Sequence, residues 1–272
     1  MMSSIGSPTT KIDLLRYNLL AQHPEITHFT TSRAGGIGTG NYSSLNLSEY
    51  SGDHPTAVAE NRLLLCNEIG IKPQHLFIPF QTHEDLIGII DSEFLSLNPE
   101  AQHLALQGVD ALITSVPNIC IGVTMADCVP ILLYDPICKV AAVVHAGWRG
   151  TVKHLASKTV ALMASQFHSN PSDIIAAIGP SIGLAAFEVG KEVAMEFTRS
   201  GFSDCIITNY PKPHIDIWAA NRQDLTEAGL NPQNIEVSGI CTYTHHDRFF
   251  SARRLGIQSG RIVTGIAIHL SP

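Results

Sequence analysis

Two short apolar runs stand next to each other in the middle of the chain, and they predict a buried β-hairpin. The first is VPILLY at residues 129–134 and the second is VAAVV at residues 140–144. The segment DPICK between them starts with Asp-Pro, a common beginning of a turn. Because the strands of a hairpin run antiparallel, Cys128 before the first strand and His145 after the second should meet at one end of it.

Further short apolar runs and a few helical segments occupy most of the remaining chain. Strands are expected at residues 26–32, 76–80, 86–90, 108–115, 119–125, 173–178 and 214–217, and in the segments that start at residues 235 and 261. Helices are expected at residues 56–70, 151–167, 187–201 and in the segment that ends at Gly229.

The predicted strands outnumber the helices and do not alternate with them regularly. This pattern favours an α/β fold with α+β-like layers, in which a mixed, largely antiparallel β-sheet core is flanked by helices. The sequence contains no linker, low-complexity tract or internal repeat. We therefore expect residues 1–272 to form a single domain.

The composition is that of an ordinary globular protein, with 272 residues, 44% of them hydrophobic and 15% charged. A formal net charge of −7 argues against nucleic acid or an anionic membrane as the main partner, because either would require a concentrated basic face. The opening residues lack the pattern of a secretory signal, and no apolar run is long enough to cross a membrane. We expect a cytoplasmic protein, in which the six cysteines are free thiols unless a metal holds them.

Cys128 and His145 suggest either a metal site or a cysteine nucleophile activated by a histidine. A third candidate is His83, which lies between the two apolar runs at residues 76–80 and 86–90. A His-Cys-His set suits zinc and leaves a fourth position open for water or substrate. A buried cysteine and satisfied structural histidines are the plainer alternative, and the spacing alone places His83 beside the others only weakly.

The segment that follows His145 is a candidate anion site. Gly147 and Gly150 predict a tight turn, and the apolar spacing predicts a helix from Thr151, whose first amides would lie beside Arg149. Trp148 would either stack on a planar ligand or close the core. Further upstream, the glycine-rich segment at residues 34–48 is either a ligand-binding loop or a surface loop.

A set of motifs, in order along the chain, resembles the multicopper polyphenol oxidoreductase (laccase-domain) family of purine nucleoside phosphorylase type. The motifs are SRAGGIGTGNYSSLNL, QTH, GVTMADCVPILLYDP, VVHAGWRGT, GPSIGLAAFEVG, HIDIWAANRQDL and CTYTHHDRFFSARR. The resemblance extends from about residue 30 to the C-terminus. It implies that His83, Cys128 and His145 bind zinc, with copper as the alternative ion.

The resemblance also implies an activity. Adenosine, inosine, guanosine and methylthioadenosine would be cleaved by phosphate to the base and a ribose 1-phosphate, and adenosine would also be deaminated. The expected partners are purine nucleosides and phosphate, and we expect a monomer. Zinc would polarise an oxygen in the first reaction and activate a water in the second.

Several residues are expected to assist the metal. Arg33, Arg149 and the amides after Gly150 would hold phosphate against the sugar. Asp127, next to Cys128, is either a proton carrier or a turn cap. A loop near the C-terminus would contact the purine and the phosphate, or else be a solvated turn; its candidates are His245, His246, Arg248, Phe249, Phe250 and Arg253.

Three other functions compete with this one. A copper-dependent polyphenol oxidase of the laccase kind would need a second group of paired histidines, but the sequence contains no His-x-His and only one close pair, His245-His246. A cysteine hydrolase would use Cys128 and His145 without a metal. An interaction module would use the metal only for structure.

Overall fold

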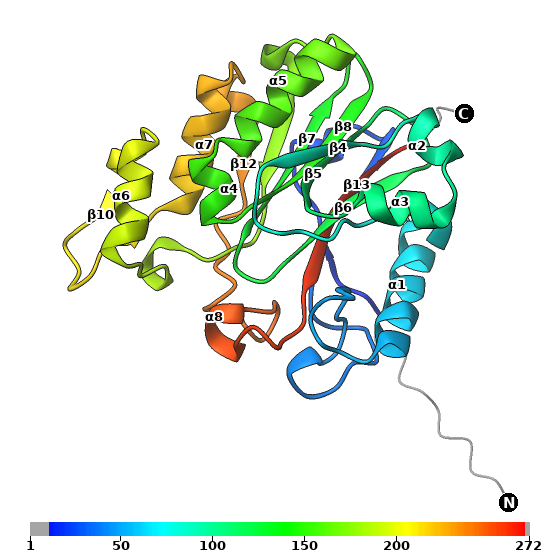
Figure 1. The fold of residues 1–272 in the computed structure, drawn as a ribbon, viewed down its shortest axis with the longest axis horizontal. Helices are drawn as coiled ribbons and strands as arrows, with labels where there is room; N and C mark the ends of the chain where they lie inside the picture. Colours follow the sequence, from blue (N-terminus) through cyan, green and yellow to red (C-terminus); the bar gives the residue numbers. More distant parts are fainter. Residues whose placement is uncertain (1–10, 270–272) are drawn as a thin grey trace, which may run out of the picture.

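The computed structural model describes residues 11–269, which form stacked layers of helix and sheet (Figure 1). Two expectations fall outside these residues. One is the absence of a secretory signal at residues 1–10, and the other is the end of the last strand at Leu270. Within the described residues, no helix is both long enough and apolar enough to cross a membrane.

A six-stranded sheet carries the predicted hairpin at its centre. The strand order is β12-β9-β7-β8-β5-β4, in which β12 with β9 and β4 with β5 are parallel pairs and the other neighbours are antiparallel. The strands are β4 (Leu86–Ile89), β5 (Val109–Thr114), β7 (Val129–Asp135), β8 (Val140–Ala146), β9 (Ile175–Ile178) and β12 (Ile235–Val237). The sheet is therefore mixed and largely antiparallel, as predicted.

A five-stranded sheet packs against the first, and a short two-stranded ribbon lies apart from both. The five-stranded sheet has the order β1-β2-β13-β6-β3, with only β3 and β6 parallel. Its strands are β1 (Leu14–Leu15), β2 (Ile26–Thr31), β3 (Leu76–Phe77), β6 (Cys120–Met125) and β13 (Ile262–Ile268). The ribbon pairs β10 (Ile206–Ile207) with β11 (His214–Ile215).

Eight α-helices surround the two sheets within residues 11–269. They are α1 (Pro55–Ile69), α2 (Ser92–Ser96), α3 (Pro99–Ala105), α4 (Trp148–Val152), α5 (Leu155–Phe167), α6 (Lys191–Arg199), α7 (Ile217–Glu227) and α8 (Ala252–Leu255). Helices α4 to α7 pack on the six-stranded sheet, and α1 packs on the far face of the five-stranded sheet. The predicted fold of a sheet core flanked by helices is confirmed. That residues 1–272 form one domain stays a prediction.

The central hairpin is buried on both faces, which explains why its strands are continuously apolar. Ile131 and Leu133 of β7 point toward the helices, whereas Leu132 and Tyr134 point toward the five-stranded sheet. The turn that follows is closed by Asp135, whose carboxylate accepts hydrogen bonds from the backbone amides of residues 137 and 138. The hairpin is thus a rigid support for the residues at its open end.

Three of the predicted helices differ in their boundaries. The helix expected at residues 187–201 is α6, which begins only at Lys191 because Gly190 before it is extended, and which ends at Arg199. α1 begins at Pro55, one residue early, and ends as predicted at Gly70, whose φ is +68°. The helix expected from Thr151 is two helices, α4 and α5, because His154 adopts a left-handed conformation with φ +58°. Its ring is held there by a 2.7 Å hydrogen bond between Nδ1 and Oδ1 of Asp224.

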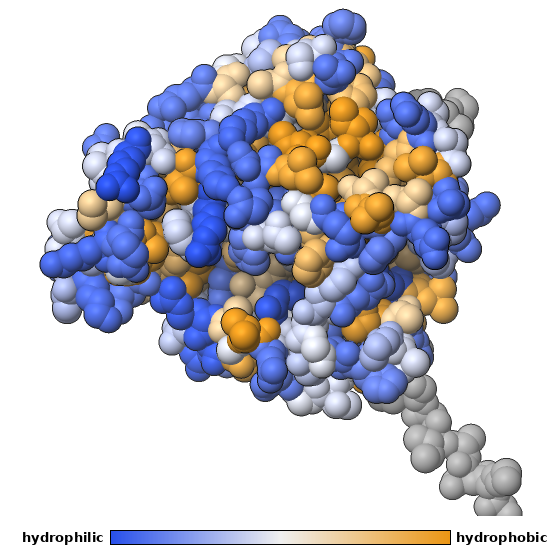
Figure 2. All heavy atoms as spheres, in the orientation of Figure 1, coloured by the Kyte–Doolittle hydropathy of each residue, from blue (hydrophilic) through white to orange (hydrophobic). Residues whose placement is uncertain are grey.

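Strand β4 forms one edge of the six-stranded sheet and comes directly after the loop that carries His83. Its first residue, Leu86, is exposed. Figure 2 shows apolar atoms gathered on the surface near this strand, while hydrophilic residues cover most of the rest of that face. The His83 loop therefore lies at an exposed margin of the fold rather than deep inside it.

Candidate metal centre

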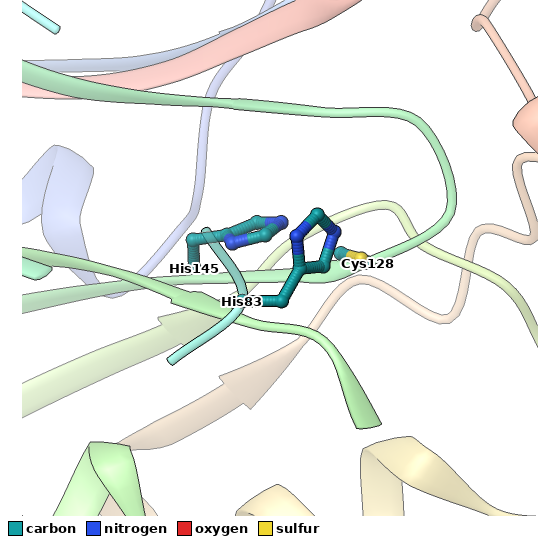
Figure 3. A group of neighbouring side chains, drawn as sticks. All are labelled: His83, Cys128 and His145. Carbon is teal, nitrogen blue, oxygen red and sulfur yellow. The ribbon is translucent and has the colours of Figure 1, made fainter. Parts of the chain in front are cut away.

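His83, Cys128 and His145 come together at the open end of the central hairpin (Figure 3). Pro130 pairs with His145 across β7 and β8, so Cys128 and His145 lie side by side as predicted. His83 arrives from the loop between β3 and β4. The candidate ligand atoms of the three residues all lie within 4.8 Å of one another, and the two imidazole rings are 4.9 Å apart at 77°.

Asp110 holds both histidines in place. Its Oδ1 accepts a 2.8 Å hydrogen bond from Nδ1 of His145 and a 3.1 Å bond from the backbone amide of His83. Its Oδ2 accepts from the amides of Thr82 and Glu84 at 3.2 and 2.8 Å. Because Nδ1 of His145 is occupied, Nε2 is the nitrogen left for a metal, which is the usual arrangement of a carboxylate behind a metal-binding histidine.

Gln81 fastens the same loop to the other sheet. Its amide nitrogen donates to the carbonyl oxygen of Thr124 at 2.9 Å, and its carbonyl oxygen accepts from the amide and the hydroxyl of Thr124 at 2.8 and 2.9 Å. His83 has a φ of +62°, which a non-glycine residue adopts only when its surroundings hold it there. Gln81 and Asp110 provide that restraint from opposite sides of the loop.

Gly147 lies against the three residues and leaves no room for a side chain. A Cβ atom added there would lie 3.0 Å from Sγ of Cys128 and 3.3 Å from Cδ2 of His83. Even an alanine would therefore push on two of the three candidate ligands. The first glycine of the AGWRG segment is thus explained by close approach to the site rather than by backbone conformation.

The charges of the three residues favour a thiolate. Burial raises the pKa of Cys128, but His145 and His83 outweigh burial and lower it to about 6. Burial likewise raises the pKa of Asp110, yet His145 and the loop amides hold it below its usual value. A thiolate and a buried carboxylate next to two imidazoles form a site that balances its charge when a cation is present.

The donor set fits a zinc ion. Two imidazoles and one thiolate are borderline-soft ligands, and three protein ligands leave one tetrahedral position free. Copper accepts the same donors. Within residues 11–269, this is the only group of three or more His, Cys, Asp or Glu side chains arranged to hold a metal ion. The described residues thus supply one metal centre and no second cluster.

The three residues open into a cavity of about 570 Å³, a volume typical of small-molecule sites. Its lining comes from both halves of the chain: Ser48, Tyr50, Ser51, Pro79, Phe80, Gln81, Thr124, Met125, Ala126, Asp127, Trp148, Arg149, Ile182, Phe187, Ile217, Ala252, Arg253, Ile257 and Arg261. Among them the wall carries three arginines and a single carboxylate. A ligand next to the metal site therefore faces a cationic, largely apolar surface.

Three of the predicted assisting residues line this cavity. Arg149 lies over the ring of Trp148 at 4.3 Å, and its guanidinium has no acceptor within hydrogen-bonding distance among the described residues. Arg253 donates to the carbonyl oxygens of Ala186 and Glu188 at 3.3 and 3.1 Å. Arg149 is therefore the freer of the two cations.

Asp127 is the single carboxylate of the lining, and both of its oxygens are paired. Oδ1 accepts from the hydroxyl of Thr242 and Oδ2 from the backbone amide of Arg253, each at 2.7 Å. Its φ of +87° also places it at a sharp turn. These contacts match the turn-capping role and tie the C-terminal loop to the site.

The structure does not bring Arg33, His245 or Phe250 to the cavity. The Arg33 guanidinium donates to the carbonyl oxygens of Ser43 and His246 at 2.8 and 2.7 Å and lies over the Phe250 ring. Phe250 itself is fully buried, and His245 makes its contacts within its own turn. The motifs that contain these residues are close to the site, but the side chains serve to hold the loops together.

The anion site expected at the amides after Gly150 is not formed. Helix α4 starts at Trp148, so the amide of Thr151 is already used in a 2.8 Å bond to the carbonyl oxygen of Gly147. The amides after Gly150 are thus part of the helix and do not face a ligand. Trp148 packs against the core on one side and lies under the Arg149 guanidinium on the other, so its contacts match the expected role in closing the core, and stacking on a ligand stays a prediction.

Sequence reasoning missed Arg261, which lines the cavity from the start of β13. Its guanidinium donates to the carbonyl oxygens of Ile257, Ser259 and Gly260. Burial lowers its pKa, whereas the nearby acidic groups of Cys128 and Asp127 raise it. The sequence does not single out Arg261, because it lies between the last motif of the site and the final strand and belongs to neither.

The sequence is similar to one protein family and to several proteins with enzyme names. Residues 27–269 match the sequence profile of the family described as multi-copper polyphenol oxidoreductase laccase. A purine nucleoside phosphorylase from Bacteroides thetaiotaomicron is 45% identical over 260 residues, which cover 94% of this chain and 96% of that protein. Adenosine deaminase RL5, from an unknown prokaryotic organism, is 42% identical over 259 residues, covering 94% and 98% of the two chains.

A solved structure shares the fold. The crystal structure of the Bacillus licheniformis hypothetical protein YfiH aligns with a TM-score of 0.86 and 29% sequence identity, covering 94% of this chain and 96% of that one. The agreement extends over both sheets and the helices around them, because so little of either chain is left out.

Proposed function

The chain belongs to the multi-copper polyphenol oxidoreductase laccase family, and from this premise we propose that it is a zinc-dependent purine nucleoside phosphorylase that also deaminates adenosine. The proposed substrates are phosphate with adenosine, inosine, guanosine or methylthioadenosine. The observation that carries the proposal is one His-Cys-His centre opening into a cavity that presents an unpaired arginine. Two relatives with these enzyme names, each more than 40% identical, support it.

The chemistry of phosphorolysis is a substitution at the sugar. A phosphate oxygen forms a bond to C1′ of the ribose while the bond from C1′ to the purine nitrogen breaks, and the base leaves with a proton. In deamination, water adds to C6 of adenosine and ammonia leaves. Zinc held by His83, Cys128 and His145 would supply the Lewis acidity that both reactions use.

Arg149 and Arg253 are the residues proposed to bind phosphate. Both line the cavity, and a guanidinium presents its donors in a geometry that matches phosphate oxygens. The Arg149 guanidinium has no hydrogen-bond acceptor within residues 11–269, whereas Arg253 is held in place by two backbone carbonyls and by the contact of its amide with Asp127. Phosphate bound between them would be oriented toward the metal centre, as required for a near-attack arrangement.

Asp127 remains the proposed proton carrier, because it is the single carboxylate among the residues that line the cavity. Its hydrogen bonds to Thr242 and to the Arg253 amide fix the direction of the carboxylate oxygens. Loss of this carboxylate should therefore slow proton transfer and also loosen Arg253.

The alternative functions gain less support from the site. A multicopper oxidase requires a second copper cluster, and residues 11–269 contain no second group of ligands. A cysteine nucleophile requires one activating imidazole, whereas Cys128 lies beside two. Metal analysis separates the classes, because a metal-free protein inactivated by thiol alkylation would favour the nucleophile.

The proposal is tested by incubating the protein with adenosine in phosphate buffer and in phosphate-free buffer, and then separating adenine, inosine and ribose 1-phosphate. We expect adenine and ribose 1-phosphate only when phosphate is present, and inosine in both buffers. If neither buffer yields a product from adenosine, inosine or guanosine, the nucleoside proposal is wrong.

A further inference from the structure

Tyr50 is the most exposed aromatic side chain of the cavity lining, at 46% of its full accessibility. Its ring lies 4.4 Å from the ring of Phe80, centroid to centroid, at an angle of 59°. The other aromatic rings of the lining are already covered, since Arg149 lies over Trp148 and Arg253 lies near Phe187. Tyr50 and Phe80 therefore present the aromatic surface that is open to a ligand.

The loop that carries Tyr50 is rigidly built. The side-chain amide of Asn46 donates to Ser51 Oγ and Asp53 Oδ2, each at 3.0 Å, while its oxygen accepts from the backbone amide of Arg261. Phe80 is fixed as well, through backbone hydrogen bonds from its amide to the carbonyl oxygen of Leu106 and from the amide of Gly108 to its own carbonyl oxygen. The aromatic surface is thus formed before any ligand arrives, so little conformational entropy is lost on binding.

Several polar side chains around this surface make hydrogen bonds within the protein. Ser48 Oγ accepts from the amide of Tyr50, and Ser51 Oγ donates to the carbonyl oxygen of Ser48. The amide of Gln81 and the hydroxyl of Thr124 bind each other. The hydroxyl groups of Ser51 and Thr124 are therefore used within the protein.

We infer that Tyr50 and Phe80 form the platform on which the base of the nucleoside stacks. The inference rests on the proposed function, which supplies the nucleoside. Stacking on an aromatic ring uses the π-face that all bases have and ignores their edges. Loss of the Tyr50 ring should therefore weaken the binding of adenosine and of inosine by a similar factor.

The test compares the wild-type protein with Tyr50→Leu, which keeps apolar volume but removes the ring, and with Tyr50→Phe, which removes only the hydroxyl. The matched control is Tyr210→Ala, because Tyr210 is also an exposed tyrosine, stacked on His214 away from this cavity. For each protein we would measure KM for adenosine, inosine and phosphate in phosphorolysis, binding of inosine by calorimetry without phosphate, and metal content.

Tyr50→Leu should raise KM for adenosine and for inosine by the same factor, roughly tenfold, and weaken inosine binding to match. In Tyr50→Leu, KM for phosphate, kcat and metal content should stay at wild-type levels, because stacking of the base stabilises the bound substrate and the transition state equally. Tyr50→Phe and Tyr210→Ala should behave like the wild type.

Unchanged nucleoside KM values in Tyr50→Leu would overturn the platform while leaving the proposed function intact. A rise in KM for only one of the two nucleosides, or an equal rise in Tyr50→Phe, would also overturn the platform, because either result would show recognition by hydrogen bonds. Failure of the proposed function is distinct, since the wild-type protein would then neither bind inosine nor convert any nucleoside.

Discussion

Replacing Asp110 by asparagine should weaken metal binding without changing any metal ligand. The carboxylate is fully buried and accepts four hydrogen bonds, two on each oxygen. Asparagine has the same shape, but one of its two positions becomes an NH2 group that cannot accept a hydrogen bond. Whichever way the amide points, two of the four donors lose their acceptor.

The size of the effect follows from those contacts. An unsatisfied buried donor costs about 1 to 3 kcal/mol, so two would cost about 2 to 6 kcal/mol of folding stability. The cost lies toward the lower end if Thr82 and Glu84, which are exposed residues, lose their acceptor, and toward the upper end if the buried His145 loses its own. Removing the carboxylate that orients a metal-binding histidine typically costs about 10- to 100-fold in metal affinity.

Two measurements on the same protein samples would separate these effects: competition for zinc with a chromophoric chelator, and urea unfolding. The control is Asp135→Asn, which changes an equally buried aspartate that caps the turn at the other end of the hairpin. Only Asp110→Asn should lose zinc affinity. Asp135→Asn should keep it, and both turn bonds of Asp135 end on Oδ1, which the asparagine oxygen can replace. Equal zinc affinity in the wild type and in Asp110→Asn would refute the role given to this carboxylate.

Three further predictions follow from individual contacts. Gly147→Ala should lower zinc affinity, measured by the same chelator competition, because the new methyl group presses on Cys128 Sγ and His83. Arg149→Ala should raise KM for phosphate about tenfold or more and leave adenosine deamination unchanged, since only phosphorolysis uses the anion. Burial, followed by the charge of a neighbouring arginine, lowers the pKa of His28 to about 4, so the folded state binds fewer protons there than the unfolded state. Stability in urea should therefore fall as pH drops from about 6.5 to 4, and His28→Gln should flatten that slope.

The hairpin and its two site residues could be predicted from the sequence because the information is local. Continuous apolar strands, an Asp-Pro turn and antiparallel pairing are enough to bring Cys128 and His145 together. His83 could be placed only by the family resemblance. The two strands that flank it, β3 and β4, belong to different sheets, so its position depends on how those sheets pack.

The rest of the site depends on long-range contacts that no motif records. Asp110 reaches His145 because β5 pairs with β8, and in the sequence it is simply a polar residue within an apolar run. Arg33 and Phe250 lie in motifs of the site, yet the fold turns them toward each other and away from the cavity. Motifs therefore identified the loops around the site correctly but could not show which side chains in them face the ligand.

A metal centre that catalyses phosphorolysis must be occupied for product to form. This is checked by measuring the ribose 1-phosphate that the wild type and Cys128→Ser release from inosine, and the zinc content of the same samples. Serine preserves the size of the side chain but is a poor zinc ligand. The account predicts that the wild type contains about one zinc per chain and releases ribose 1-phosphate only with phosphate, and that Cys128→Ser loses both the metal and the product. A zinc-free Cys128→Ser that still releases ribose 1-phosphate at the wild-type rate, or a zinc-loaded wild type that releases none, would contradict it.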